Sequence, residues 1–132
     1  MLIRKFIDYF QLSVIRAIII YDDLEAGEVL SDFLTIKGVD IVGIGYTSEQ
    51  AIEMYKEYKP DVIILELKIP EHDGKNAIDE IKKIHSAAKI IVVSNSSSYK
   101  IDKDKISGYF VKPYDIDKFI STIKKITVKN GN

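Results

Sequence analysis

Short apolar runs alternate along the chain with longer segments in which apolar residues recur every three or four positions. The runs contain no regular polar alternation, which is typical of strands buried on both faces of a parallel sheet. They lie at Ala17–Tyr21, Ile41–Ile44, Val62–Leu65, Ile90–Val93 and Tyr109–Val111. The segments with helical spacing are Leu24–Ile36, Ser48–Tyr58, Asn76–Ile84, a weak one near Tyr99–Ile106, and Ile116–Val128. The pattern therefore predicts strands and helices in strict alternation.

Cap and turn residues support these boundaries. Gly38 follows the first predicted helix, Thr47 or Ser48 can cap the second, Pro60 follows it, and Asp115 opens the last. Strict alternation implies right-handed crossovers and helices on both faces of a parallel sheet. We therefore expect an α/β fold, a doubly wound five-stranded parallel sheet of the flavodoxin-like (βα)5 type. In such a sheet, ligands bind at the carboxyl ends of the strands.

The first fifteen residues lie outside this pattern. Their apolar and polar side chains separate onto two sides at helical spacing, which predicts an amphipathic helix. The apolar side comprises Leu2, Ile3, Phe6, Ile7 and Phe10, and the other comprises Arg4, Lys5, Asp8 and Gln11. Such a helix must bury its apolar side against its own domain, a second copy, another protein or a membrane surface. With only two basic residues, it favours its own domain or a homodimer.

Composition narrows the function classes. The 132 residues fit one domain, and the formal net charge of −1 gives no electrostatic case for nucleic acid. No apolar run reaches the ~18 residues of a membrane span, and the absence of cysteine fits a reducing compartment. We expect a cytoplasmic protein. No GxxxxGK[ST] motif occurs, which excludes a P-loop enzyme.

Polar side chains follow the predicted strands where their carboxyl ends should converge. Asp22 and Asp23 follow the first strand, Glu66 the third, Ser94 the fourth and Lys112 the fifth. Carboxylates held together repel one another, and a hard cation such as Mg²⁺ relieves that repulsion. A lysine and a hydroxyl suit a phosphoryl oxygen. The simpler alternative is that Asp22 caps the first helix and Glu66 pairs with Lys112.

These motifs together resemble the CheY-like receiver domain of two-component response regulators. The matching stretches are the Asp22-Asp23 pair, "DVIILELKIPEHDG", Ser94 after "IIVV", "GYFVKP", and "VDIVGIGYTSEQAIEMYKEYKPDVIILEL". The resemblance covers roughly Arg16 to Val128. Together with the amphipathic pattern of the first fifteen residues, it divides the chain into an N-terminal extension, residues 1–15, and a receiver-like domain, residues 16–129.

The resemblance implies roles for the acidic residues. Glu66 stands where the family has the aspartate that attacks a phosphohistidine and becomes an acyl phosphate. Asp22 and Asp23 would hold Mg²⁺ together with that position, and the backbone carbonyl of Lys68 would complete the coordination.

Three further residues would form the switch that responds to the phosphoryl group. Phosphorylation draws in the hydroxyl at the position of Ser94, and the aromatic side chain at the position of Tyr109 turns inward. The lysine at the position of Lys112 pairs with the phosphoryl group.

The chain departs from the family pattern at the reacting residue, because Glu66 replaces aspartate. Its extra methylene moves the oxygens by roughly an ångström, and such misplacement can cost about a hundredfold in rate. The longer acid could instead reach towards Lys112 and Ser94, where a phosphoryl oxygen would stand. Asn95 follows Ser94 where the family usually has a small residue, so it is expected to narrow access to the site. The short spacing from Ser94 to Lys112 predicts a stunted fourth helix or a loop in "SNSSSYK".

Three functions follow from these patterns. The first is a stand-alone, non-enzymatic signalling module that binds a partner protein, with Glu66 making its regulation independent of phosphorylation or constitutively biased. The second is a response regulator that is still phosphorylated by a histidine kinase. The third is a flavodoxin-like binder of flavin or another phosphorylated ligand, which the acidic "YDDLEAGE" stretch disfavours.

Overall fold

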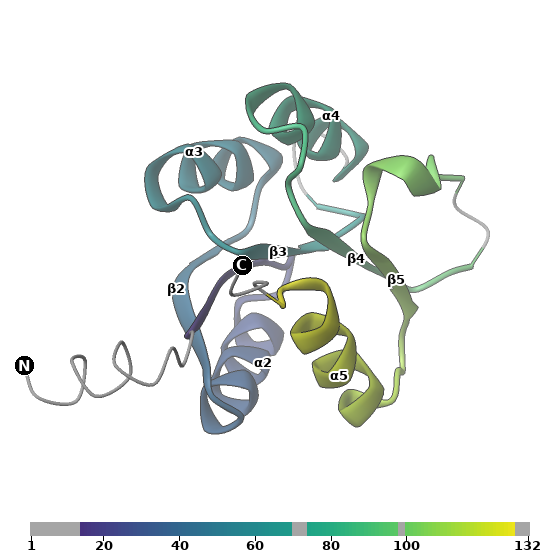
Figure 1. Ribbon diagram of the computed structural model, residues 1–132. Helices are drawn as coiled ribbons and strands as arrows, with labels where there is room; N and C mark the ends of the chain where they lie inside the picture. The colour runs from purple at the N-terminus through teal and green to yellow at the C-terminus, as the bar shows by residue number, and fades with distance from the viewer. Residues whose placement is uncertain (1–13, 70–73, 98–99, 129–132) are drawn as a thin grey trace, which may run out of the picture.

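The computed structural model describes residues 14–69, 74–97 and 100–128. Five strands form one parallel sheet in the order β2-β1-β3-β4-β5 (Figure 1). Their bounds are β1 Ile15–Ile20, β2 Val39–Gly45, β3 Val62–Glu66, β4 Ile90–Ser94 and β5 Gly108–Val111. The predicted doubly wound α/β fold is confirmed. The predicted N-terminal helix lies outside the described residues.

Helices cover both faces of the sheet. They are α2 Leu24–Ile36, α3 Ser48–Tyr58, α4 Gly74–Ile84 and α5 Ile116–Ile126. Figure 1 shows α3 and α4 on one face and α2 and α5 on the other. No helix in the described part of the chain has the length and apolar character that a membrane span requires.

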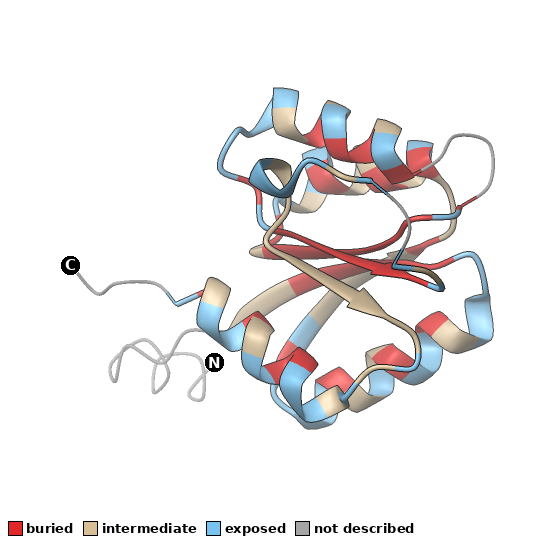
Figure 2. Cartoon of the chain, turned by 90° about the vertical axis from the view of Figure 1, so that its right-hand side faces the viewer, coloured by how far each residue is buried: buried red, intermediate tan, exposed pale blue. Residues whose placement is uncertain are grey.

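Two apolar clusters fill the spaces between the sheet and its helices. Ile18, Ile63 and Val92 belong to the cluster under α3 and α4, and Ile19 and Phe119 belong to the cluster under α2 and α5. Residues of the central strands are fully buried, as Figure 2 shows, which explains why their sequences lack polar alternation. Each fully buried isoleucine contributes roughly 1.5–3 kcal/mol, so the two clusters fix the strand ends in place.

One predicted helix is wrong. The segment near Tyr99–Ile106 contains only the 3₁₀ turn η1, Lys103–Lys105, among its described residues. Ile101 and Ile106 pack against the core, but the residues between them are Asp and Lys, which leaves no apolar side that a longer helix could bury. The expected shortening of the fourth crossover agrees with this arrangement.

The helix caps follow from local side-chain chemistry. Thr47 caps α3 in a capping box with Gln50, and Asp115 caps α5 through the N–H groups of residues 117 and 118. The cap of α2 is Asp23, whose Oδ1 accepts from the N–H groups of residues 25 and 26. The alternative in which Asp22 caps this helix is therefore wrong, and Asp22 remains available to the sheet edge.

Candidate functional site

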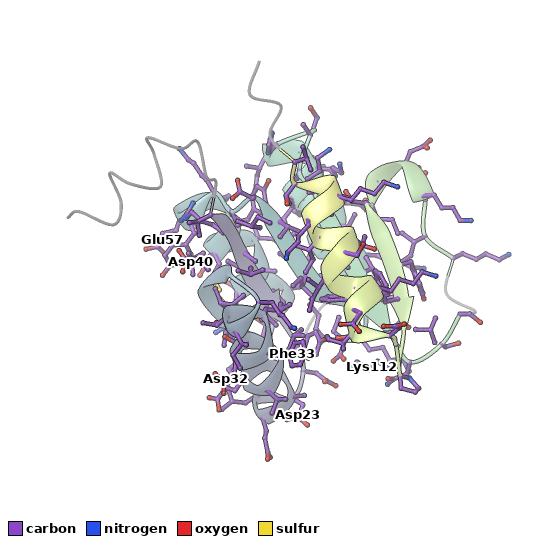
Figure 3. All side chains as sticks on the ribbon, turned by 60° about the horizontal axis from the view of Figure 1, so that its bottom comes forward. Asp23, Asp32, Phe33, Asp40, Glu57 and Lys112 are labelled. Atoms are coloured by element: carbon purple, nitrogen blue, oxygen red, sulfur yellow. The ribbon has the colours of Figure 1, made fainter. Side chains whose placement is uncertain are left out.

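The predicted polar residues meet at the carboxyl edge of the sheet. Glu66 is the last residue of β3 and Ser94 the last of β4, and both are buried, with 4% and 2% of their surface exposed. Lys112 follows β5, and its N–H donates to the carbonyl of Ser94 at 2.8 Å. Figure 3 shows Asp23 and Lys112 at the same end of the molecule. The topology thus brings together residues that are far apart in sequence.

Glu66 is engaged through both carboxylate oxygens. Its Oε1 accepts from the backbone N–H of Asp22 at 3.1 Å, and its Oε2 forms an ion pair with Lys112 Nζ. The Glu66 side chain is 5% exposed and that of Lys112 is 30% exposed. The pairing of Glu66 with Lys112, one of the alternatives from the sequence, is therefore present.

Burial raises the pKa of the Glu66 carboxyl above its ordinary value, and the nearby Asp22 carboxyl raises it further. The Lys112 ammonium and the Asp22 N–H lower the pKa, because both stabilise the charged form. Lys112 thus offsets part of the cost of placing a carboxylate at this buried strand end.

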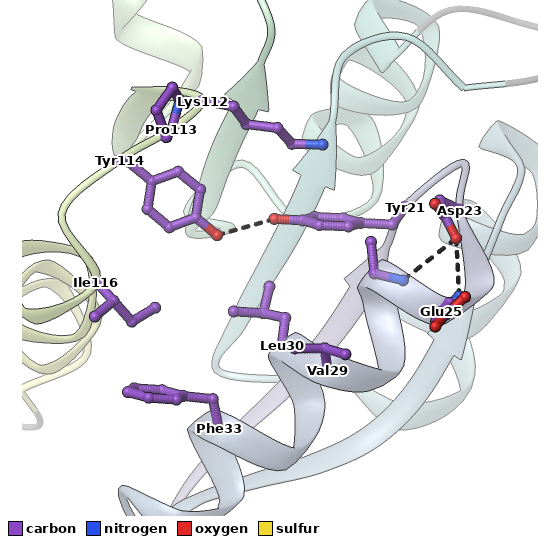
Figure 4. A pocket seen from close by; sticks show the side chains of 11 residues that line it. Tyr21, Asp23, Glu25, Val29, Leu30, Phe33, Lys112, Pro113, Tyr114 and Ile116 are labelled. Carbon is purple, nitrogen blue, oxygen red and sulfur yellow. Dashed lines mark hydrogen bonds between the residues drawn. The ribbon is translucent and has the colours of Figure 1, made fainter.

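Sequence reasoning missed two tyrosines near this ion pair, of which Tyr21 contacts Lys112. The Lys112 ammonium lies 4.7 Å from the centroid of the Tyr21 ring, within the range of a cation–π contact. The Tyr21 hydroxyl is 3.1 Å from that of Tyr114, as Figure 4 shows, and the Tyr114 ring stacks on Phe119. Burial raises the pKa of the Tyr21 hydroxyl, which therefore stays protonated and able to donate.

The two predicted switch residues meet at one loop residue. Ser94 Oγ accepts from the N–H of Ser96 at 3.1 Å, and the Tyr109 hydroxyl donates to the carbonyl of Ser96 at 2.7 Å. The half-buried Tyr109 ring packs against the cluster under α3 and α4. Ser94 and Tyr109 are thus joined through the loop after β4.

This geometry coincides with a family match over most of the chain. Residues 17–124 match the response regulator receiver domain. The chain belongs to the response regulator receiver family. Family membership confirms the resemblance found in the sequence and favours two-component signalling over the flavodoxin-like alternative.

Two chemotaxis receivers align along nearly their whole length. The chain is 32% identical over 114 residues to the chemotaxis protein CheY of Bacillus subtilis, covering 83% of this chain and 95% of that protein. It is 31% identical over 116 residues to CheY of Thermotoga maritima, covering 85% and 97%. A CheX–CheY–BeF3–Mg²⁺ complex from Borrelia burgdorferi contains a chain of the same fold, with a TM-score of 0.82 and 23% identity, covering 92% of this chain and 95% of that chain.

The acidic residues of this receiver fit Mg²⁺ in chemistry but not in arrangement. Oxygen donors are available on Asp22, Asp23, Glu66 and the carbonyl of Lys68. However, Asp23 caps α2 and Glu66 pairs with Lys112, and the described residues contain no group of three or more His, Cys, Asp or Glu side chains placed to hold a metal. Magnesium binding by these residues stays a prediction.

Proposed function

We propose that this receiver is a non-enzymatic cytoplasmic signalling module whose state is set by Glu66 rather than by phosphorylation. In this proposal Glu66 occupies the phosphoacceptor position, and the output is the binding of another signalling protein. The observation that carries the proposal is the buried Glu66 carboxylate, which already has the Asp22 N–H on one oxygen and Lys112 on the other.

Access and geometry both disfavour phosphoryl transfer to Glu66. A nucleophilic carboxylate must present an oxygen in line with the incoming phosphorus, and this side chain is only 5% exposed. Its ion pair with Lys112 would have to break first, and Lys112 would then be needed to neutralise the phosphoryl group. The extra methylene adds a displacement of roughly an ångström, enough for about a hundredfold loss in rate.

We also propose a direction for the bias, towards the state in which Tyr109 is turned inward. The family pattern associates that state with a phosphoryl group paired to the lysine at the position of Lys112. Here Glu66 supplies a negative oxygen to Lys112, and the Tyr109 ring packs against the core with its hydroxyl on the Ser96 carbonyl. Both features support a constitutive, activated-like conformation.

The partner is a signalling protein that recognises this conformation. The Borrelia burgdorferi relative of the same fold is bound to CheX in its complex with BeF3 and Mg²⁺. We propose by analogy that the present chain engages a protein partner without requiring a phosphoryl group. A histidine kinase remains the partner expected under the alternative, in which the receiver is still phosphorylated.

Intact mass spectrometry separates these alternatives. Wild type, Glu66→Asp and Glu66→Gln are incubated with acetyl phosphate, with and without Mg²⁺. We expect only Glu66→Asp to gain a phosphoryl group, because aspartate shortens the acid and frees an oxygen from Lys112. Phosphorylation of the wild type, lost in Glu66→Gln, would refute the proposal and establish Glu66 as an acceptor.

The bias needs a separate measurement. The Tyr109 ring and Ser96 carbonyl resonances report the hydrogen bond that the Tyr109 hydroxyl donates to the Ser96 carbonyl. In Glu66→Ala, which removes the anion from Lys112, we expect these resonances to shift towards a more mobile ring. Unchanged resonances would show that Glu66 does not set the position of Tyr109.

A further inference from the structure

We infer that residues 1–13 of this chain fold back over the groove between α2 and α5 and cover it. This inference is independent of how Glu66 is regulated. It proposes where the apolar side of the N-terminal segment is buried, because the receiver site uses no residue of that segment.

The groove has a volume of about 890 Å³ and is lined mostly by apolar side chains. Its aliphatic and phenylalanine side chains are Ala26, Val29, Leu30, Phe33 and Ile116, of which Figure 4 labels the last four.

The apolar surface continues along α2 beyond the groove. Val29, Phe33 and Ile36 are spaced by four and three residues, so they lie on one side of this helix. Val29 is 65% exposed and Ile36 is 79% exposed. A contiguous exposed apolar surface of this kind marks a site that something covers.

The chain enters the domain on this same side. Ile15, the first residue of β1, packs against the cluster that also includes Phe33 and Ile116. The crossover from β1 to β2 runs α2 antiparallel to β1, so the last turn of α2, with Ile36, lies near the start of β1. A segment that precedes Ile15 can therefore turn back directly along α2.

The length of the segment matches the surface. Residues 1–13 would span ~20 Å as a helix, which is also the length of the 13-residue helix α2. A second copy of the protein is not needed to bring the segment to the groove, and a short tether raises its effective concentration there.

Charge favours this groove over the opening between α3 and α4. Helix α2 carries Glu25, Glu28 and Asp32 and no basic residue. The polar side of the segment carries two basic residues and one acidic residue, Arg4, Lys5 and Asp8. Figure 3 shows Asp23 and Asp32 at the α2 side of the molecule.

Another apolar opening is lined by basic side chains, which have the same charge as Arg4 and Lys5. It has a volume of about 400 Å³ and lies between α3 and α4, where Lys56, Lys59 and His85 line it. Charge therefore favours the α2–α5 groove over this opening for a segment that carries Arg4 and Lys5.

Paramagnetic relaxation on the full chain tests the inference. The chain has no cysteine, so Asp8→Cys provides a single site for a nitroxide on the predicted polar side of the segment. In the labelled, ¹⁵N-enriched chain we expect amides from Val29 to Ile36 in α2, and those in α5, to lose intensity. Amides of α3 and α4 should keep theirs. Loss on α3 and α4, or loss nowhere beyond the strand start, would overturn the inference.

Two matched substitutions place the contact. Val29→Lys puts a charge in the groove at a residue that is 65% exposed, and Ile84→Lys puts the same charge on α4 at one that is 42% exposed. We expect Val29→Lys to abolish the intensity loss and Ile84→Lys to leave it unchanged. If Val29→Lys fails to fold, Ile36→Lys replaces it, since Ile36 is 79% exposed. Intensity loss that survives the charge in the groove would refute the placement.

Mixed samples separate the chain's own segment from that of a second copy. Unenriched, spin-labelled chain is combined with ¹⁵N-enriched chain that carries no label. We expect no intensity loss in the mixture. Loss on α2 and α5 of the unlabelled copy would show that the groove receives a neighbouring chain, and the inference would be wrong.

Discussion

Replacing Lys112 with methionine tests whether the ion pair makes the buried Glu66 charge tolerable. The substitution keeps an unbranched side chain of similar length but removes the ammonium. Glu66 is then left 4% exposed, with the Asp22 N–H still donating to its Oε1. Removing one partner of a buried ion pair costs about 3–5 kcal/mol, because the other charge stays uncompensated. The reverse change, Glu66→Gln, leaves Lys112 30% exposed and able to reach water, so we expect it to cost only about 1 kcal/mol.

Protonation of Glu66 limits the cost of Lys112→Met, and this gives the prediction a pH dependence. The pKa of Glu66 in the folded protein is raised above its unfolded value, so the folded state binds more protons between the two values. Stability therefore falls as pH rises through that window. Protonating Glu66 costs about 1.36 kcal/mol for each pH unit above its unfolded pKa of ~4.3. Since the folded protein can take up this proton instead of burying the charge, the penalty cannot exceed about 4 kcal/mol at pH 7.5 or about 1 kcal/mol at pH 5.

Urea unfolding followed by circular dichroism at these two pH values measures the effect. We expect Lys112→Met to lose far more stability at the higher pH than at the lower, and the double variant with Glu66→Gln to recover most of that loss. The recovery follows because no buried charge remains. A Lys112→Met cost that is the same at both pH values, or no larger than that of Glu66→Gln, would refute the reasoning.

Three further changes test local features by the same unfolding measurement. Gly27→Ala should raise stability by about 0.5–1 kcal/mol, because Gly27 lies inside α2 and a Cβ there meets its nearest side-chain atom at 3.4 Å. Gly74→Ala should lower stability by about 1–3 kcal/mol, because its Cβ would come within 2.8 Å of the Leu67 carbonyl oxygen. An unchanged unfolding midpoint would show that the backbone near Leu67 and Gly74 can shift to accommodate the Cβ at no cost in stability. Thr47→Ala should cost about 1 kcal/mol by removing the capping box with Gln50, and Thr47→Ser should restore most of it.

The fold could be predicted because burial on both faces leaves a strong sequence signal. Val62–Leu65 was predicted as a strand and β3 extends it by one residue to Glu66. Sequence periodicity could not place the weak helix near Tyr99–Ile106, where Asp and Lys side chains form only η1. The expectation of a shortened segment rested instead on the spacing between Ser94 and Lys112.

The sequence predicts which residues form the candidate site better than it predicts the contacts between them. Parallel topology alone brings Glu66, Ser94 and Lys112 to one edge. It does not reveal which of two adjacent acids caps a helix, because a one-residue shift of the helix start exchanges their roles. Nor could it reveal the hydroxyl contact between Tyr21 and Tyr114, which lie 93 positions apart and follow no local pattern.

Those two tyrosines connect the groove to the ion pair. Tyr21 and Tyr114 line the groove, and the Tyr21 ring also lies beneath the Lys112 ammonium that holds Glu66. Tyr21 is 3% exposed and its hydroxyl is bonded to Tyr114, so moving its ring would disturb the groove wall and the position of Lys112 together. We therefore predict that a groove ligand that prefers one position of this ring shifts the Glu66–Lys112 pair, and by reciprocity the state of the pair then changes the affinity of the groove by the same factor.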